Sequence, residues 1–425
     1  MGKCCVEFDW VMPVDMLSPK TVYIIGAGFS RRANVPLQDE ILEAVRNFDI
    51  SDAPGTLVDP FLAALTETSE FLDLAFGSHG VPSLEDIYTL IDQAVESRQF
   101  YLGKSWRELY DVGRALSEAI LFLFHIREQR VSKEVRDFYE MIGAHLIQQR
   151  LAAGLENHPF SVISLNWDCV LDNAIYRCLD RINLSLVDID YCCYSTPVPE
   201  SNRHVASITQ KSSGLHNIKL MKLHGSTNWM LCPNCNRLYT GLGCESEQWT
   251  AYILGKSCPR CQHIHQTFAS PERNIVPPRL EPFLITPTFV KKFENPHIKM
   301  VWHNAYIDLC EAQDVVFIGY SLREADYHLR TLFKRAIRPD ANIKVVLAPS
   351  DKPAKGNLAA KWKGATARYS NFFGIDENSF NYDGVRGHFK GMLDSQSLQQ
   401  LIETIRRKAA SIQNKSSDIL SGGVK

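Results

Sequence analysis

Two pairs of cysteines in the second half of the chain constrain its fold more than any other feature. Cys232-Pro-Asn-Cys235 and Cys258-Pro-Arg-Cys261 have the C-x-x-C spacing of a tetrathiolate zinc site. Four thiolates around one tetrahedral ion leave no open coordination position, so the metal is expected to be structural. We therefore predict a small zinc-ribbon module over residues 232–270, with Zn²⁺ held by all four cysteines.

The length and charge of the chain narrow the class of protein. With 425 residues it is long enough for two or three structural units. Its formal net charge of -2 provides no overall attraction to nucleic acid or to an anionic membrane. The N-terminus carries acidic residues where a secretory signal needs an apolar run, and the longest apolar stretch, Ala119–Phe124, is too short to span a bilayer. A cytoplasmic protein without a membrane segment is expected.

Short apolar runs alternate with helical patterns over much of the chain. We predict strands at 21–25, 160–165, 218–223, 283–286, 314–318 and 343–347. We predict helices at 37–48, 170–179, 297–312, 325–337 and 395–411. Nearly continuous apolar strands that alternate with helices are typical of a sheet covered on both faces. The predicted fold class is α/β, with a doubly wound, mainly parallel Rossmann-like sheet.

The pattern also suggests a division of the chain. Residues 51–157 have a helical period almost throughout and are predicted to be a helical insertion. The predicted units are an N-terminal arm and the start of the core (1–50), the helical insertion (51–157), the continued core (158–231), the zinc ribbon (232–270), the completed core (271–392), and a C-terminal helix with a disordered tail (393–425).

Polar motifs follow four of the predicted strands. They are the glycine turn Gly26-Ala27-Gly28-Phe29-Ser30, then Asn166-Trp167-Asp168, His224-Gly225, and Gly319-Tyr320-Ser321. Ligands of doubly wound sheets bind outside the carboxyl ends of the strands. We therefore expect the four motifs to share one site.

Each motif also has a simpler interpretation. The glycine turn favours a nucleotide site, although Arg31 stands where a dinucleotide fingerprint has its third glycine, and a plain tight turn is the alternative. Asn166 or Asp168 could only cap the following helix. His224 is either an ordinary histidine or a proton acceptor at a strand end.

Taken in order, these motifs and the two cysteine pairs resemble the sirtuin core over residues 21–30 and about 160–350. The chain is more similar to the sirtuin-like NAD hydrolases of bacterial antiphage defence than to the protein deacylases. It has Asn34-Val-Pro-Leu-Gln-Asp39 where deacylases have Gly-Ile-Pro-Asp-Phe-Arg. Leu284-Ile-Thr-Pro-Thr-Phe289 stands near the place of the deacylase Phe-Gly-Glu segment.

The resemblance implies roles for individual residues, with NAD as the substrate. The turn at Gly26 would place Ala27, Gly28 and Ser30 against the NAD pyrophosphate. Gly319 and Ser321 would border the adenosine half, and Asp168 would contact the nicotinamide side. The implied catalytic residues are Asn166, which positions water and the nicotinamide ribose, and His224, which binds or deprotonates a ribose hydroxyl.

The same resemblance implies an NAD hydrolase that depletes NAD during abortive infection. It also implies control by assembly, with a homo-oligomer and a HerA-type hexameric ATPase as expected partners. An NAD-dependent protein deacylase or ADP-ribosyltransferase is the alternative among enzymes. A zinc-ribbon nucleic-acid-binding module with a nucleotide-sensing pocket is the other alternative, motivated by the cations Lys219, Lys222, Arg237, Lys256 and Arg260.

Overall fold

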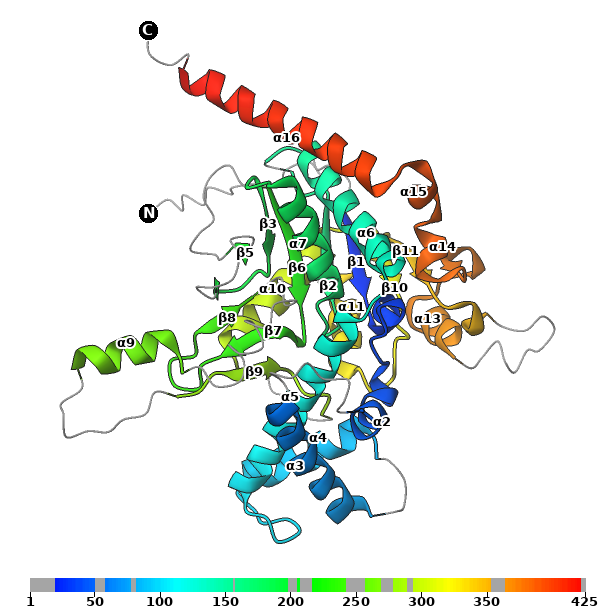
Figure 1. The fold of residues 1–425 in the computed structure, drawn as a ribbon. Coiled ribbons are helices and arrows are strands. Elements are labelled where there is room, and N and C mark those ends of the chain that lie inside the picture. Colours follow the sequence, from blue (N-terminus) through cyan, green and yellow to red (C-terminus); the bar gives the residue numbers. More distant parts are fainter. Residues whose placement is uncertain are drawn as a thin grey trace, which may run out of the picture.

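A parallel sheet forms the centre of the computed structural model (Figure 1). The structure describes residues 20–49, 58–77, 82–155, 157–197, 205–206, 216–241, 257–268, 278–288, 293–352 and 364–421. The sheet has eight strands in the order β12-β11-β10-β1-β2-β6-β3-β5, and every neighbouring pair is parallel. This arrangement confirms the predicted α/β fold class.

The strand bounds agree with the apolar runs that predicted most of them. The strands are β1 (Thr21–Ile25), β2 (Phe160–Ser164), β3 (Val187–Asp190), β5 (Val205–Ala206), β6 (His216–Lys222), β10 (Asp314–Ile318), β11 (Asn342–Val346) and β12 (Phe380–Asn381). All five residues of β2 are buried. Burial on both faces suits the apolar residues of this central strand, and Ser161 and Ser164 are buried with them.

Helices cover both faces of the sheet, as a doubly wound fold requires. In Figure 1, α6 (Lys133–Ala152) and α7 (Val170–Ile182) lie in front of the strands, and α10 (Pro296–Glu311) lies behind them. The helix α11 (Tyr327–Ala336) connects β10 to β11. Phe317 of β10 packs edge-on against Phe333 of α11, with ring centroids 5.3 Å apart.

A second, smaller sheet has the order β4-β8-β7-β9. Its strands are β4 (Ser195–Pro197), β7 (Gly225–Leu231), β8 (Leu238–Thr240) and β9 (Glu281–Leu284). The strand predicted at 283–286 was assigned to the parallel sheet, and this assignment was wrong, because β9 pairs antiparallel with β7. Pro282 has no amide hydrogen to donate, which suits the edge strand of a small sheet better than an interior strand.

The described residues between β1 and β2 are mainly helical. They form α3 (Val58–Phe76), α4 (Leu84–Ser97), α5 (Trp106–Gln129) and α6. Three of these helices have side-chain caps: the Ser83 hydroxyl accepts from the Asp86 amide at 3.1 Å, Ser105 forms a capping box with Glu108, and the Ser132 hydroxyl accepts from the Val135 amide at 3.4 Å. In Figure 1, α3, α4 and the start of α5 project beyond the sheet, whereas the end of α5 reaches its edge.

Two helix predictions were wrong in their bounds. In place of one helix over 37–48, the short helix α1 (Ala27–Ser30) follows β1, and a 3₁₀ turn (Gln38–Glu40) precedes α2 (Ile41–Arg46). The C-terminal helix α16 spans Leu398–Ser421, so residues 412–421, predicted as part of a disordered tail, are helical. The remaining helices are α9 (Pro259–Phe268), α13 (Ala365–Phe373), α14 (Gly384–His388) and α15 (Lys390–Ser395). No helix in the described part of the chain has the length and apolar character needed to cross a membrane.

Candidate active site

One cavity of about 720 Å³ collects residues from the ends of several strands of the main sheet. The predicted residues on its wall are Gly26, Ala27, Gly28, Asn166, His224, Gly319 and Ser321. The strand order reverses between β1 and β10, which is where doubly wound sheets bind their ligands. The volume lies within the range of about 300–1,000 Å³ that is usual for small-molecule sites.

The glycines of this site allow two backbone loops to meet. The Gly28 amide donates to the Gly319 carbonyl oxygen at 2.8 Å. A Cβ atom on Gly28 would lie 2.9 Å from the Gly319 Cα, and one on Gly319 would lie 2.3 Å from the Phe29 nitrogen. Gly319 also has a φ of 66°, in the left-handed region. These glycines are therefore required by loop packing as well as by the shape of the cavity.

We expect Gly319→Ala to be strongly destabilising, because it adds both a steric clash and a strained backbone. The matched control is Gly374→Ala, since Gly374 has a φ of 74° but nothing within 4 Å of an added Cβ. Overpacking typically costs about 1–3 kcal/mol. Urea denaturation should show a loss for Gly319→Ala that exceeds the loss for Gly374→Ala by about that amount. Equal losses would mean that the two loops can separate without cost.

Asn166 is the most firmly held polar residue of the cavity wall. Its side chain is 7% exposed, and its Nδ2 donates to the Gly26 carbonyl oxygen at 3.0 Å and to the Ser30 hydroxyl at 3.2 Å. The Ser30 hydroxyl in turn donates to Asp168 Oδ1 at 2.8 Å. With both amide hydrogens used by the protein, the carbonyl oxygen is the remaining polar atom of Asn166.

Ser30 and Asp168 lie behind this wall rather than on it. Ser30 is completely buried and supports Asn166 and Asp168. Asp168 Oδ1 accepts from the Val170 amide at 3.2 Å, so Asp168 does cap the start of α7. Burial raises the pKa of the Asp168 carboxyl, although Lys222 and the Ser30 hydroxyl oppose this shift.

A smaller cavity of about 80 Å³ adjoins the first and shares Ala27, Asn166 and His224 with it. Its further lining includes the aromatic side chains Phe124 and Trp167, and the carboxyl of Asp168. Asp326 also lines this recess, so it has two carboxyl groups among mainly apolar side chains. Such a lining suits a flat aromatic amide better than an anionic group.

His224 lies where β6 ends and β7 begins. Its Nδ1 is 3.1 Å from the Leu165 carbonyl oxygen. A carbonyl oxygen only accepts, so Nδ1 carries the hydrogen and Nε2 is the acceptor in the neutral ring. The next residue, Gly225, has a φ of 75°, and a Cβ there would lie 2.1 Å from the Phe283 carbonyl oxygen. The His-Gly pair therefore marks a backbone turn between the two sheets.

Four arginines that the sequence did not predict as site residues line the cavity wall. They are Arg31, Arg32, Arg323 and Arg386. Arg31 pairs with Glu40, and Arg323 forms two hydrogen bonds to Asp39, at 2.8 and 2.7 Å. Arg32 and Arg386 both face Glu134, at 3.9 and 3.7 Å, and the wall also carries Asp326, Asp351 and Asp383. Arginines suit a phosphate-bearing ligand that replaces these carboxylate partners. The adjacent pair directly after the glycine turn was a usable signal, whereas Arg386 is distant from every motif.

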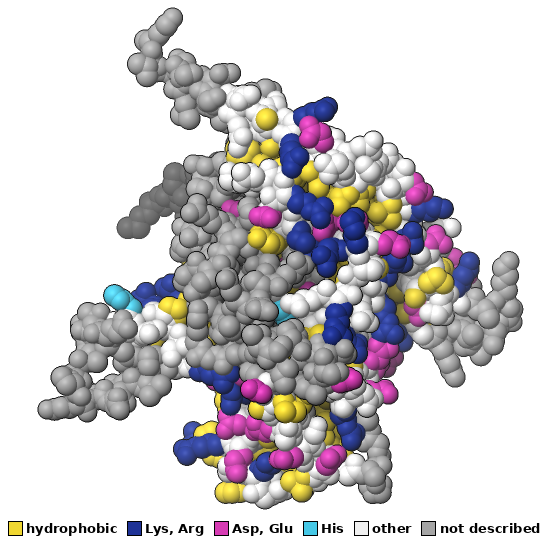
Figure 2. All heavy atoms as spheres, viewed as in Figure 1, with side chains coloured by type: hydrophobic (Ala, Val, Ile, Leu, Met, Phe, Trp, Pro, Cys, Tyr) yellow, Lys and Arg dark blue, Asp and Glu magenta, His cyan; other side chains and the backbone are white. Residues whose placement is uncertain are grey.

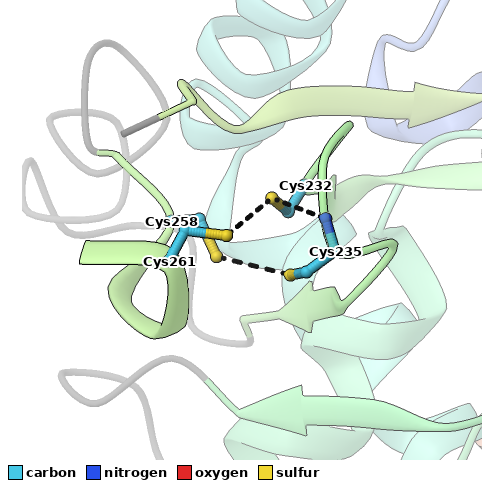
Figure 3. Close-up of side chains that lie close together, drawn as sticks. All are labelled: Cys232, Cys235, Cys258 and Cys261. Atoms are coloured by element: carbon cyan, nitrogen blue, oxygen red, sulfur yellow. Dashed lines mark hydrogen bonds between the residues drawn. The ribbon is translucent and has the colours of Figure 1, made fainter. Parts of the chain in front are cut away.

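The four predicted cysteines form a compact cluster (Figure 3). Their sulfur atoms all lie within 4.8 Å of one another, with Cys232 and Cys261 at 3.8 Å and Cys235 and Cys258 at 3.7 Å. Thiolates about 2.3 Å from a tetrahedral zinc are separated by about 3.8 Å, so the cluster can hold this ion. Asn234 Nδ2 donates to the Cys261 sulfur at 3.4 Å. None of the four is among the described residues that line the cavity.

Solved structures that resemble this chain include several sirtuins and Sir2 homologues. A structure that addresses sirtuin substrate affinity is 13% identical, with a TM-score of 0.38, and the match covers 90% of this chain and 96% of that chain. A complex of a Sir2 homologue with NAD is 11% identical, with a TM-score of 0.38 and coverage of 92% and 90%. A Sir2 complex with p53 peptide and NAD⁺ is 12% identical, with a TM-score of 0.36 and coverage of 93% and 93%. No protein-family model and no curated protein matches the chain.

Proposed function

We propose that this chain is a sirtuin-like NAD hydrolase that cleaves NAD to nicotinamide and ADP-ribose. The observation that carries the proposal is that the four motifs meet at one cavity. The sequence resemblance had assigned the same four motifs to one NAD site. The four arginines on the wall can donate to a pyrophosphate that replaces their present carboxylate partners, and the adjoining recess suits nicotinamide. Both cavities share Asn166 and His224, so the scissile bond would lie beside these two residues.

The reaction needs positioning more than a strong nucleophile. The bond between nicotinamide and the ribose C1′ breaks, and its electron pair leaves with neutral nicotinamide. A water oxygen bonds to C1′, and the proton released passes to a base or to solvent. Asn166, held at its amide nitrogen, would orient the water through its carbonyl oxygen, and His224 would accept a proton at Nε2.

The product distribution separates this proposal from a deacylase. We expect purified protein, assayed alone and together with the HerA-type ATPase, to release free ADP-ribose and nicotinamide from NAD without any acylated peptide. Chromatography of reactions with and without an acetyl-lysine peptide measures this directly. Acetyl-ADP-ribose as the main product would refute the hydrolase. ADP-ribose attached to protein would indicate a transferase instead.

The segment that stands near the deacylase motif ends at Phe289, which lies outside the described residues.

Two of the five cations that motivated the nucleic-acid alternative are paired with carboxylates. Lys219 pairs with Asp308 at 2.9 Å, and Lys222 pairs with Asp172 at 3.3 Å in the interior. Arg237 lies 3.4 Å from the Thr196 hydroxyl, Arg260 is exposed, and Lys256 is outside the described residues. On the face shown in Figure 2, basic and acidic side chains are interspersed rather than segregated. A nucleic-acid site would need a patch of exposed basic side chains with few acidic ones among them, so that phosphates could be neutralised.

The motif resemblance also supports a biological role for this reaction. We propose an NAD-depleting effector of antiphage defence that is controlled by assembly, as a homo-oligomer and with a HerA-type ATPase. An uncontrolled hydrolase of this kind would deplete its own host of NAD. Comparing NAD consumption with and without the ATPase tests the control, and equal rates would refute it.

A further inference from the structure

The segment Leu165–Cys169, called the site loop below, is anchored along its backbone by several parts of the fold. The anchors from strands and strand ends are Leu165 N to Ile25 O at 2.9 Å, His224 Nδ1 to Leu165 O at 3.1 Å, Thr227 N to Trp167 O at 2.8 Å, and Lys222 Nζ to Asp168 O. A further anchor is the Cys169 amide, which donates to Glu128 Oε1 at 3.0 Å. Glu128 belongs to the last turn of α5, so this anchor comes from the helical segment.

Glu128 supports the start of α7 as well as the end of the site loop. Its second oxygen, Oε2, accepts from Asn173 Nδ2 at 3.1 Å, one turn into α7. The residue at the N-cap position, Cys169, has no side-chain cap of its own. A helix N-terminus leaves backbone amides without partners, and a carboxyl group there is favourable. Glu128 therefore adds to the cap that Asp168 provides, from 41 residues away along the chain.

The same helix also reaches the smaller cavity. Phe124 lies one turn before Glu128, on the same face of α5, and lines the recess beside Trp167 and Asp168. A shift of α5 along or about its axis would thus move one wall of the recess together with the anchor of the site loop. Interiors are too closely packed to absorb such a shift locally.

We propose that Glu128 is a positioning residue that fixes the site loop, and with it Asn166, to the end of helix α5. The positioning role of Glu128 rests on the proposed NAD hydrolysis only for its expected effect on kcat. Burial, together with the nearby Asp168 carboxylate, raises the pKa of the Glu128 carboxyl well above its ordinary range. The uncharged amide of Glu128→Gln is therefore a close substitute for the Glu128 carboxyl group. In Glu128→Gln, the amide oxygen would still accept from Cys169, and Asn173 could rotate its amide to present Oδ1, which has no partner in the native arrangement.

The first test reads the position of the site loop without any reaction. Protein labelled with 5-fluorotryptophan gives a fluorine resonance for Trp167, which is assigned with Trp167→Phe. We expect Glu128→Ala to shift or broaden this resonance, whereas Glu128→Gln leaves it in place. The control is Asp111→Asn on the same helix, where the carboxylate is 52% exposed and pairs only locally with Arg114. An unchanged Trp167 resonance in folded Glu128→Ala would overturn the proposal.

The second test reads the consequence for catalysis. We expect Glu128→Ala to lower kcat at least about 10-fold with KM for NAD changed less than about 3-fold, because a displacement of about 1 Å can cost 100-fold in rate. Glu128→Gln should recover most of kcat. If Glu128→Ala does not fold, Glu128→Asp replaces it, since the shorter carboxylate cannot reach both partners. A wild type that never cleaves NAD would refute the proposed function, while the Trp167 resonance would still decide the role of Glu128.

Discussion

Replacing Asn166 with alanine should lower kcat for NAD cleavage by about 100-fold or more. Groups that orient or activate a reacting water typically contribute 10²–10⁴ in rate, so about two orders of magnitude is the smaller expectation. The amide of Asn166 is held by Gly26 and Ser30, so the native carbonyl oxygen is aimed without further rearrangement. Nicotinamide release, followed by chromatography over a range of NAD concentrations, gives kcat and KM separately.

Two companion variants show whether the loss is chemical or structural. Asn166→Asp keeps the size of the side chain but removes the amide donors to Gly26 and Ser30, and we expect it to be as inactive as Asn166→Ala. His224→Ala should also lose most of its activity, because it removes the proton acceptor and the contact to Leu165. Each variant should retain the unfolding midpoint of the wild type within a few degrees. Wild-type turnover in both Asn166→Ala and His224→Ala would show that these residues do not take part in the reaction.

Strands made up mainly of apolar residues were predictable from the sequence. The strands β1 and β10 occupy the predicted residues because interior strands of a parallel sheet are apolar on both faces. The strand β3 was missed because its sequence, Val-Asp-Ile-Asp, contains two carboxylates that are nevertheless buried. Asp190 Oδ1 accepts there from the Cys192 amide at 2.8 Å. A partner of this kind exists only in the folded chain and leaves no periodic signal.

Within the candidate site, the polar turns that follow strands were predictable from the sequence. The residues that hold these turns in place, such as Glu128, were not. The motifs at Gly26, Asn166, His224 and Gly319 each follow a strand, and strand direction alone brings them to one edge of the sheet. The contribution of Glu128 depends on how α5 meets α7. Helix packing of this kind is set by three-dimensional contacts, so no local spacing in the sequence indicates it.

Removal of the metal should unfold the region of the smaller sheet while leaving the chemistry of the folded fraction unchanged. The cluster joins the end of β7, at Cys232, to the first turn of α9, which carries Cys261. The binding energy of a structural zinc is also folding energy, about 10–16 kcal/mol in zinc-finger peptides. We therefore expect one zinc per chain by elemental analysis. In Cys258→Ser, we expect both a loss of zinc and a lower unfolding midpoint.

The effect on turnover separates a structural metal from a catalytic one. The strand β7 begins at Gly225, directly after His224, so unfolding from the cysteine end would reach the cavity through this strand. Activity should then fall in parallel with the folded fraction, and exchange of zinc for cobalt should leave kcat unchanged, because four thiolates leave no position for substrate. The control is Cys310→Ser, which removes a partly buried thiol outside the cluster. A kcat that changed with the identity of the metal in fully folded protein would place the ion in the reaction instead.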